Sequence, residues 1–270
     1  MEAYLQHLDQ VAETPDRARK AWNKLKPKFE GADACQVTSL ARSFSSRSTS
    51  ASSTVARELG VLKAALRWSV RNGTIDAVPY IEMPPATPPR SLALTKDQYK
   101  ALLAEAKGPY PHLYDFLRIS LLTGQRQAAV LGLTWDRVDL DRGYVDFRDP
   151  KKGSRAKGAA YLPIGDELRA VFEEIRARTD GSPVWVVTYK GLRIAHVRRS
   201  WKKVTDKLGI DGACRHTLRH TVATQLIENG VSLQKVSRLL GHASVRTTER
   251  NYVKYSPEYV RDAVDGISLG

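Results

Sequence analysis

The chain contains the stretch HTLRHTVATQLIENGVSLQKVSRLLGHASVRTTERNY at residues 216–252. Its first motif, His216-x-x-Arg219, places an imidazole and a guanidinium one turn apart on the same face of a helix. Together these side chains offer a proton acceptor and a bidentate clamp to one phosphate. Because such pairs also occur on solvated helix surfaces, the motif needs support from the rest of the chain.

The second half of the stretch combines a helix end with two further candidate residues. Ser232 caps a helix that Gly241 ends, and His242 stands at the turn into the next helix. Tyr252 falls late in that next helix, where an aromatic side chain equally suits core packing. The pattern predicts a helix, a turn and a second helix, with polar chemistry at the turn.

A third group of polar residues lies earlier, in Thr123-Gly124-Gln125-Arg126. The glycine ends a helix expected over 111–122, and Arg126 stands beside the start of the next helix. A guanidinium and the backbone N–H groups of a helix start both attract anions. This position therefore suits a phosphate, although an arginine at a helix start is often only solvated.

The composition narrows the possible partners. The 270 residues include 43 Lys and Arg against 29 Asp and Glu, a formal net charge of +14, with 42% hydrophobic residues. This charge indicates a polyanionic partner, most commonly nucleic acid. The two cysteines, Cys35 and Cys214, form no ligand cluster, so neither a structural zinc site nor a disulfide framework is expected. No cofactor is expected. Without a signal sequence or a long apolar run, the chain is expected in the cytoplasm.

A proline-rich segment predicts a boundary between two domains. Four prolines in the six residues 84–89 favour an extended spacer. We therefore expect a helical domain over 1–83, a linker over 84–91 and a second domain over 92–270. In the first domain, helices are expected over 15–29 and 53–72, separated by a Ser/Thr-rich stretch at 43–54.

The second domain is expected to be mostly helical with a small sheet. Thr95 and Gln98 form a capping-box pattern at the start of a helix that continues to Ala106. Two short strands are expected at 144–147 and 160–163, on either side of a basic turn at 150–158. Helices follow from Asp166 onward, ending with a short one after Ser256-Pro257.

The order of these motifs resembles the tyrosine recombinase (phage integrase) family over essentially the whole chain. The segments TGQR, HTLRHTVAT and LLGHASVRTTERNY carry the resemblance, and residues 53–68 look like that family's core-site DNA-binding domain. The resemblance implies a mainly α (α+β) fold, in which a helical DNA-binding domain is joined to a catalytic domain with a small antiparallel sheet. It also implies a site-specific DNA recombinase that needs neither metal nor ATP.

The resemblance assigns a role to six residues. Tyr252 is implied as the nucleophile that forms a 3′-phosphotyrosyl link, with Arg126 and Arg219 binding the non-bridging phosphate oxygens. His216 is the implied proton acceptor, and His242 a hydrogen-bond donor to the phosphate. A lysine of the β-hairpin would protonate the leaving 5′-oxygen. For this lysine we favour Lys157, with Lys151 and Lys152 as alternatives.

The chain departs from the family pattern in two places. Ala129 occupies the position three after Arg126, where the family usually has an acidic residue. Tyr252 follows His242 by ten residues, whereas nine is the most common spacing. This leaves Tyr255 as a minor alternative nucleophile.

Two other functions fit parts of the sequence. Residues 231–247 also match a helix-turn-helix, as in a non-catalytic DNA-binding regulator. A type IB topoisomerase would share the active-site chemistry, but the small size and the missing coiled-coil linker favour a recombinase. The expected partner is double-stranded DNA. Four copies of the chain are expected to assemble on paired DNA sites, and the free chain is expected to be a monomer in solution. A DNA-bending or directionality protein could assist, and no separate arm-binding domain is expected.

Overall fold

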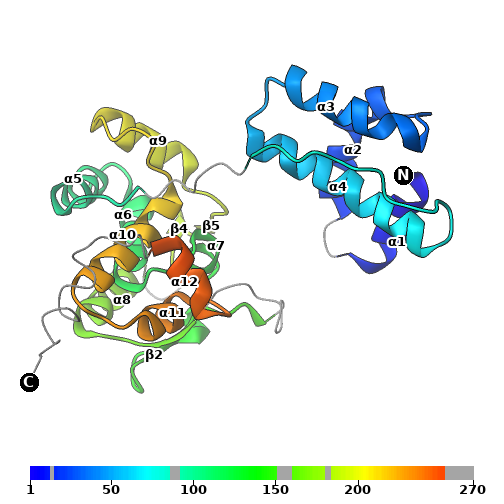
Figure 1. Ribbon diagram of the computed structural model, residues 1–270. Helices are drawn as coiled ribbons and strands as arrows, with labels where there is room; N and C mark the ends of the chain where they lie inside the picture. The colour runs from blue at the N-terminus through cyan, green and yellow to red at the C-terminus, as the bar shows by residue number, and fades with distance from the viewer. Residues whose placement is uncertain (13–14, 86–91, 151–159, 180–183, 253–270) are drawn as a thin grey trace, which may run out of the picture. The chain divides into compact units, whose positions relative to one another are not determined.

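Figure 1 shows the computed structural model of the chain. The structure describes residues 1–12, 15–85, 92–150, 160–179 and 184–252, with only the backbone of 250–252. The chain divides into two compact units, Met1–Pro89 and Arg90–Gly270. Its helices and its small antiparallel sheets confirm the expected mainly α (α+β) class.

All the regular secondary structure in the described part of the first unit is helical. It consists of α1 (Glu2–Val11), α2 (Pro15–Phe29), the 3-10 turn η1 (Ala34–Gln36), α3 (Val37–Arg47) and α4 (Ser52–Arg71). Helix α4 packs against α2, and the fully buried Leu25 and Leu59 lie in the core that they share. At the edge of this core, Lys24 Nζ donates to the buried Glu58 carboxylate over 2.7 Å.

Helix α3 was not expected, because its last turn lies in the Ser/Thr-rich stretch that starts at Ser43. Its Val37, Ala41 and Phe44 recur at helical spacing and are buried, and the Phe44 ring lies edge-on 6.2 Å from Phe29. Serine lowers helix propensity only by tenths of a kcal/mol, whereas burying a phenylalanine contributes about 2 kcal/mol. Tertiary packing therefore outweighs the local preference of the serines.

The second unit packs helices around a small sheet. Its helices are α5 (Lys96–Ala106), α6 (Pro111–Thr123), α7 (Gln127–Leu131), α8 (Asp166–Arg178), α9 (Arg198–Lys207), α10 (Arg215–Glu228), α11 (Leu233–Leu240) and α12 (Val245–Tyr252), with the 3-10 turn η2 (Trp135–Arg137). Its strands are β1 (Val138–Asp139), β2 (Tyr144–Asp146), β3 (Tyr161–Pro163), β4 (Thr188–Tyr189) and β5 (Leu192–Arg193). The strands form the antiparallel sheet β1-β2-β3 and the hairpin β4-β5.

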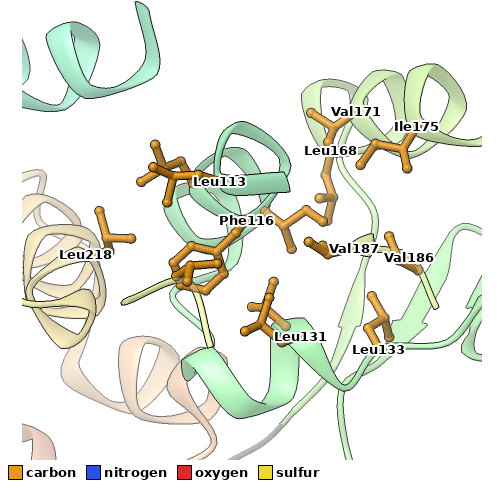
Figure 2. Close-up of a cluster of buried hydrophobic side chains, with 14 of the residues drawn as sticks. Leu113, Phe116, Leu131, Leu133, Leu168, Val171, Ile175, Val186, Val187 and Leu218 are labelled. Carbon is orange, nitrogen blue, oxygen red and sulfur yellow. The ribbon is translucent and has the colours of Figure 1, made fainter. Parts of the chain in front are cut away.

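The core of the second unit is continuous from α6 to the sheet (Figure 2). Leu113 and Phe116 of α6 lie at its centre, with Leu131 and Leu133 on one side and Leu218 of α10 on another. Leu168, Val171 and Ile175 of α8 recur at helical spacing and cover the remaining side. This core fixes α6, α7 and α10, the three helices that carry the predicted arginines or stand beside them.

The expected strands at 144–147 and 160–163 are present as β2 and β3, with Val145 opposite Leu162. The hairpin β4-β5 was not expected. Its two turn residues, Lys190 and Gly191, both have positive φ, 52° and 76°, as a two-residue type I′ turn requires. A lysine rarely occupies such a position, so Gly191 was the one turn signal in these two residues.

Within the described residues, no helix combines the length and the apolar character needed to cross a bilayer.

Gly124 joins α6 to α10 and α11 by close packing. Its φ of 63° ends α6, and its N–H donates to Ser120 O over 2.8 Å. A methyl group added to its Cα would lie 2.8 Å from Leu240 Cδ2 and 3.3 Å from Val222 Cγ1. This turn therefore needs glycine for its conformation and also for space.

Gly124→Ala should lower the free energy of unfolding more than Gly209→Ala. Gly209 has nearly the same φ, 62°, but no atom within 4 Å of an added methyl group. The conformational strain alone should cost about 1 kcal/mol at either site, and overpacking should add about 1–3 kcal/mol at Gly124. Urea unfolding followed by circular dichroism measures both values. Equal losses would show that Leu240 and Val222 do not confine this turn.

Candidate active site

Arg219 is a buried arginine at the junction of three helices. It lies on α10 with only 1% of its surface exposed. Its Nη1 donates to Gly124 O over 3.0 Å, and its Nη2 donates to Leu240 O over 2.6 Å. Gly124 ends α6 and Leu240 is the last residue of α11, so one guanidinium holds two helix ends against α10.

At the end of α11, some backbone carbonyl groups accept from backbone N–H groups and others accept from side chains. The N–H of Gly241 donates to Arg238 O over 3.0 Å, and the N–H of His242 donates to Ser237 O over 2.9 Å. These two bonds form a Schellman motif around Gly241, whose φ is 65°. The carbonyls of Leu239 and Leu240 come later in the helix and accept from side chains instead.

Gln125 satisfies the first of these carbonyls. Its Nε2 donates to Leu239 O over 2.6 Å, and its side chain is buried. The neighbouring carbonyl of Leu240 accepts from Arg219, as described above. The turn after α6 and the end of α11 are therefore joined by two side chains, one neutral and one cationic.

His242 is held by the helix that follows it. Its Nδ1 lies 2.8 Å from Oγ1 of Thr248, which is fully buried in α12. This bond fixes the ring plane and leaves Nε2 on the opposite edge of the imidazole. The arrangement confirms the expected position of His242 at the turn between α11 and α12.

His216 lies in the first turn of α10, whose start is fixed by a reciprocal pair of bonds between Cys214 and Thr217. Its side chain remains accessible at the surface, and its ring stands perpendicular to that of His220 at 5.1 Å. The helix therefore presents His216 and the buried Arg219 one turn apart, as the sequence motif predicted.

Both histidines titrate abnormally. Partial burial, followed by the charges of His220, Arg219 and Arg126, lowers the pKa of His216 to about 4. Partial burial, followed by the charges of Arg219, Arg126 and His216, lowers the pKa of His242 to about 4. Both imidazoles are therefore neutral at pH 7 and are able to accept a proton.

Arg126 belongs to the same electrostatic cluster. It is the residue before the first turn of α7, with extended backbone (φ −67°, ψ 149°), and its charge lowers the pKa of both histidines. The structure thus brings together Arg126, His216, Arg219 and His242 from three separate segments of the chain. Ala129 packs against the core and supplies no carboxylate to this cluster.

The remaining predicted residues are placed less completely. Tyr252 is the last residue of α12, a helix that packs against α10 and α11. Lys157, together with its alternatives Lys151 and Lys152, lies outside the described residues, as does Tyr255. In the described part of the chain, no group of three potential metal ligands is present.

Sequence patterns alone did not reveal Gln125 or Thr248 as parts of the site. A glutamine after a helix-ending glycine is common in solvated turns, and only the fold brings it to the end of α11. Thr248 had one usable signal, because it lies six residues after His242, close enough along the next helix to face the turn.

Comparisons with known proteins identify the family of this chain. The model of the phage integrase family matches residues 93–258. The tyrosine recombinase XerA of Thermococcus kodakarensis is 33% identical over 222 residues, which cover 79% of this chain and 76% of the relative. XerD of Halalkalibacterium halodurans is 30% identical over 214 residues, covering 74% of this chain and 70% of the relative.

Solved structures share the fold. The integrase of transposon Tn1549, in complex with a circular intermediate DNA, has a TM-score of 0.80 at 17% identity and covers 98% of both chains. A lambda integrase tetramer bound to a Holliday junction has a TM-score of 0.74 at 15% identity, covering 94% of this chain and 78% of that one. The family match and the sequence relatives together establish that this chain belongs to the phage integrase family and is a tyrosine recombinase, an enzyme that breaks and rejoins DNA in site-specific recombination.

Proposed function

We propose that this recombinase cuts each DNA strand with Tyr252 while Arg126 and Arg219 hold the scissile phosphate. The supporting observation is the cluster of two arginines and two neutral histidines, which come from separate segments and interact electrostatically. Two guanidinium groups provide the positive charge that a phosphoryl-transfer transition state requires. The neutral imidazoles beside them supply the proton acceptor.

In the proposed step, the Tyr252 oxygen forms a bond to phosphorus and the bond to the 5′-oxygen breaks. The phenol proton passes to His216, and His242 donates a hydrogen bond to a non-bridging oxygen. Lys157 gives a proton to the leaving 5′-oxygen. A phenol with a pKa near 10 needs cationic surroundings to react at neutral pH. The phosphotyrosine retains the energy of the broken phosphodiester, so rejoining needs no ATP or metal ion.

The fixed geometry of Arg219 supports its assigned role. A guanidinium has five N–H donors in one rigid plane, and two carbonyl bonds orient that plane before any ligand arrives. A group that is already oriented stabilises developing charge without the cost of rearrangement. This arrangement suits a clamp for the transition state better than a mobile surface arginine would.

The proposed partner is double-stranded DNA, bound by four copies of the chain on two duplexes. Solved relatives of this fold are bound to DNA, including a tetramer on a Holliday junction. In free solution we propose a monomer, which assembles on its sites. DNA bending or directionality proteins are compatible with this arrangement.

A strip of exposed cations lies close to Arg126. It comprises Lys190, Arg193, Arg198, Arg199 and Lys203. Lys202 of the same segment is paired with Asp206 over 2.6 Å. Residues 189–205 contain no acidic side chain. His196, within the strip, lies 3.2 Å from the side chain of Gln127, the residue after Arg126. We propose that the strip binds phosphates along the DNA strand that enters the site.

Tyr252→Phe should abolish the covalent adduct with a nicked or suicide DNA site, because the nucleophilic oxygen is lost. Wild-type protein should form an adduct that survives denaturing gel electrophoresis. Tyr255→Phe serves as the matched control and should still form it. An adduct with Tyr252→Phe, or none with wild type on its cognate site, would contradict the assigned nucleophile.

Neutralising the strip should weaken binding in a salt-dependent way. For Arg199→Gln with Lys203→Gln, the slope of log affinity against log salt should fall by about 1 for each lost phosphate contact. Lys207→Gln is the control, because the Lys207 charge is already paired with Glu105 at 2.7 Å. Fluorescence anisotropy with labelled DNA measures these slopes. An unchanged slope for the double variant would exclude the strip from the DNA contact.

As the pH is lowered, kcat/KM for cleavage should begin to fall only well below pH 6.5. If His216 accepts the proton, kcat/KM reports its pKa in the free enzyme, about 4. The rate should stay nearly constant from pH 7.5 to 5.5, where a histidine with an ordinary pKa would lose about tenfold. Cleavage rates at protein and DNA concentrations well below the Kd are proportional to kcat/KM and measure this profile, with His216→Gln as reference. A half-maximal rate near pH 6.5 would contradict a neutral, low-pKa base.

A further inference from the structure

Arg126 stands between two glutamines, and each of them is bound to a different segment of the site. Gln125 is 2% exposed, and its Nε2 donates to Leu239 O over 2.6 Å and to Thr123 O over 3.3 Å. Leu239 lies three residues before His242. The residue before Arg126 is therefore tied to the segment that carries one predicted histidine.

Gln127 makes a second connection on the other side. Its Oε1 accepts from Arg215 Nε over 3.0 Å, and its Nε2 donates to Ala195 O over 3.3 Å. Arg215 directly precedes His216 at the start of α10. The residue after Arg126 is therefore tied to the segment that carries the other predicted histidine.

We propose that Gln125 and Gln127 are positioning residues that hold Arg126 at the scissile phosphate. This inference rests on the proposed role of Arg126. The three-residue link 124–126 between α6 and α7 is too short to be held by its own secondary structure, and α7 itself has only five residues. Ala129 on α7 offers no polar group to orient Arg126. The two amides are the groups next to Arg126 that connect its backbone to α10 and α11.

An amide suits both positions better than a carboxylate. Gln125 must donate to a carbonyl, which a carboxylate cannot do. Gln127 must accept from Arg215 and also donate to Ala195 O, which an amide does and an ionised carboxylate does not. A carboxylate beside Arg126 would in addition compete with the phosphate for its guanidinium.

The test measures single-turnover cleavage of a suicide DNA site by Gln125→Met, Gln127→Met and Gln127→Glu. Methionine keeps the size of glutamine and removes both hydrogen-bonding groups. Misplacing a catalytic group by about 1 Å can cost up to about 100-fold, so each methionine variant should cleave about 10–100 times more slowly. Gln127→Glu keeps the bond to Arg215 and should recover part of this loss. Gln234→Met, at an exposed glutamine of α11, is the control and should cleave at the wild-type rate.

Two further readouts separate positioning from a general structural effect. Affinity for DNA and the thermal midpoint should change little in Gln127→Met. When Gln127→Met is added to Arg126→Gln, the further loss should be less than about twofold, because the residue being positioned is already absent. A DNA site with a methylphosphonate at the scissile position should also show a smaller penalty for Gln127→Met, since the neutral phosphate needs the guanidinium less.

The outcomes of these experiments distinguish a failure of the positioning role from a failure of the proposed function on which it rests. If wild type forms the Tyr252 adduct and Arg126→Gln is slow, but both methionine variants cleave at the wild-type rate, the positioning role is wrong and the proposed function stands. Full additivity of Gln127→Met with Arg126→Gln would also overturn the positioning role. If wild type forms no adduct, or Arg126→Gln is as fast as wild type, the proposed function fails and this inference fails with it.

Discussion

The second unit is organised around one buried charge. Arg219 is 1% exposed, and a guanidinium does not lose its proton, so its charge must be balanced inside the protein. The carbonyls of Gly124 and Leu240 provide that balance at the ends of α6 and α11, where the helix dipoles are negative. Both helices must end at fixed places against α10, and glycines with positive φ end them there. Burying the Arg219 charge therefore requires that α6, α10 and α11 pack together in this arrangement.

The buried charge also affects the two histidines. Burial is the largest cause that lowers the pKa of both His216 and His242, and the charges of Arg219 and Arg126 add to the effect at each. The imidazoles stay neutral because burial and the nearby positive charges both oppose protonation. The two arginines thus suit the binding of an anion and also keep two proton acceptors available beside it.

Much of this arrangement could be predicted from the sequence. Helical spacing and end signals predicted the bounds of five helices to within one or two residues, because the apolar stripe and the end signals of each agree. These helices are α2, α4, α5, α6 and α11. The motif His216-x-x-Arg219 predicted that these two residues share one face of a helix, and Gly124 and Gly241 predicted where helices end. Helix α3 and the hairpin β4-β5 were missed, because burial of Phe44 and the positive φ of Lys190 oppose local propensity. The contacts of Gln125 could not be predicted, because the bond to Leu239 O joins residues 114 positions apart.

The electrostatics of the site change when a phosphate enters it. A phosphodiester between Arg126 and Arg219 would offset the positive charge that now holds down the pKa of His216 and His242. Each imidazole would then bind a proton more readily than in the free protein, although burial would still oppose full protonation. In the proposed mechanism, the proton affinity of His216 would therefore rise when the phosphate is in place, which is when the attacking phenol must lose its proton. If this mechanism holds, a site built from two arginines and two neutral histidines would gain basicity from its own substrate.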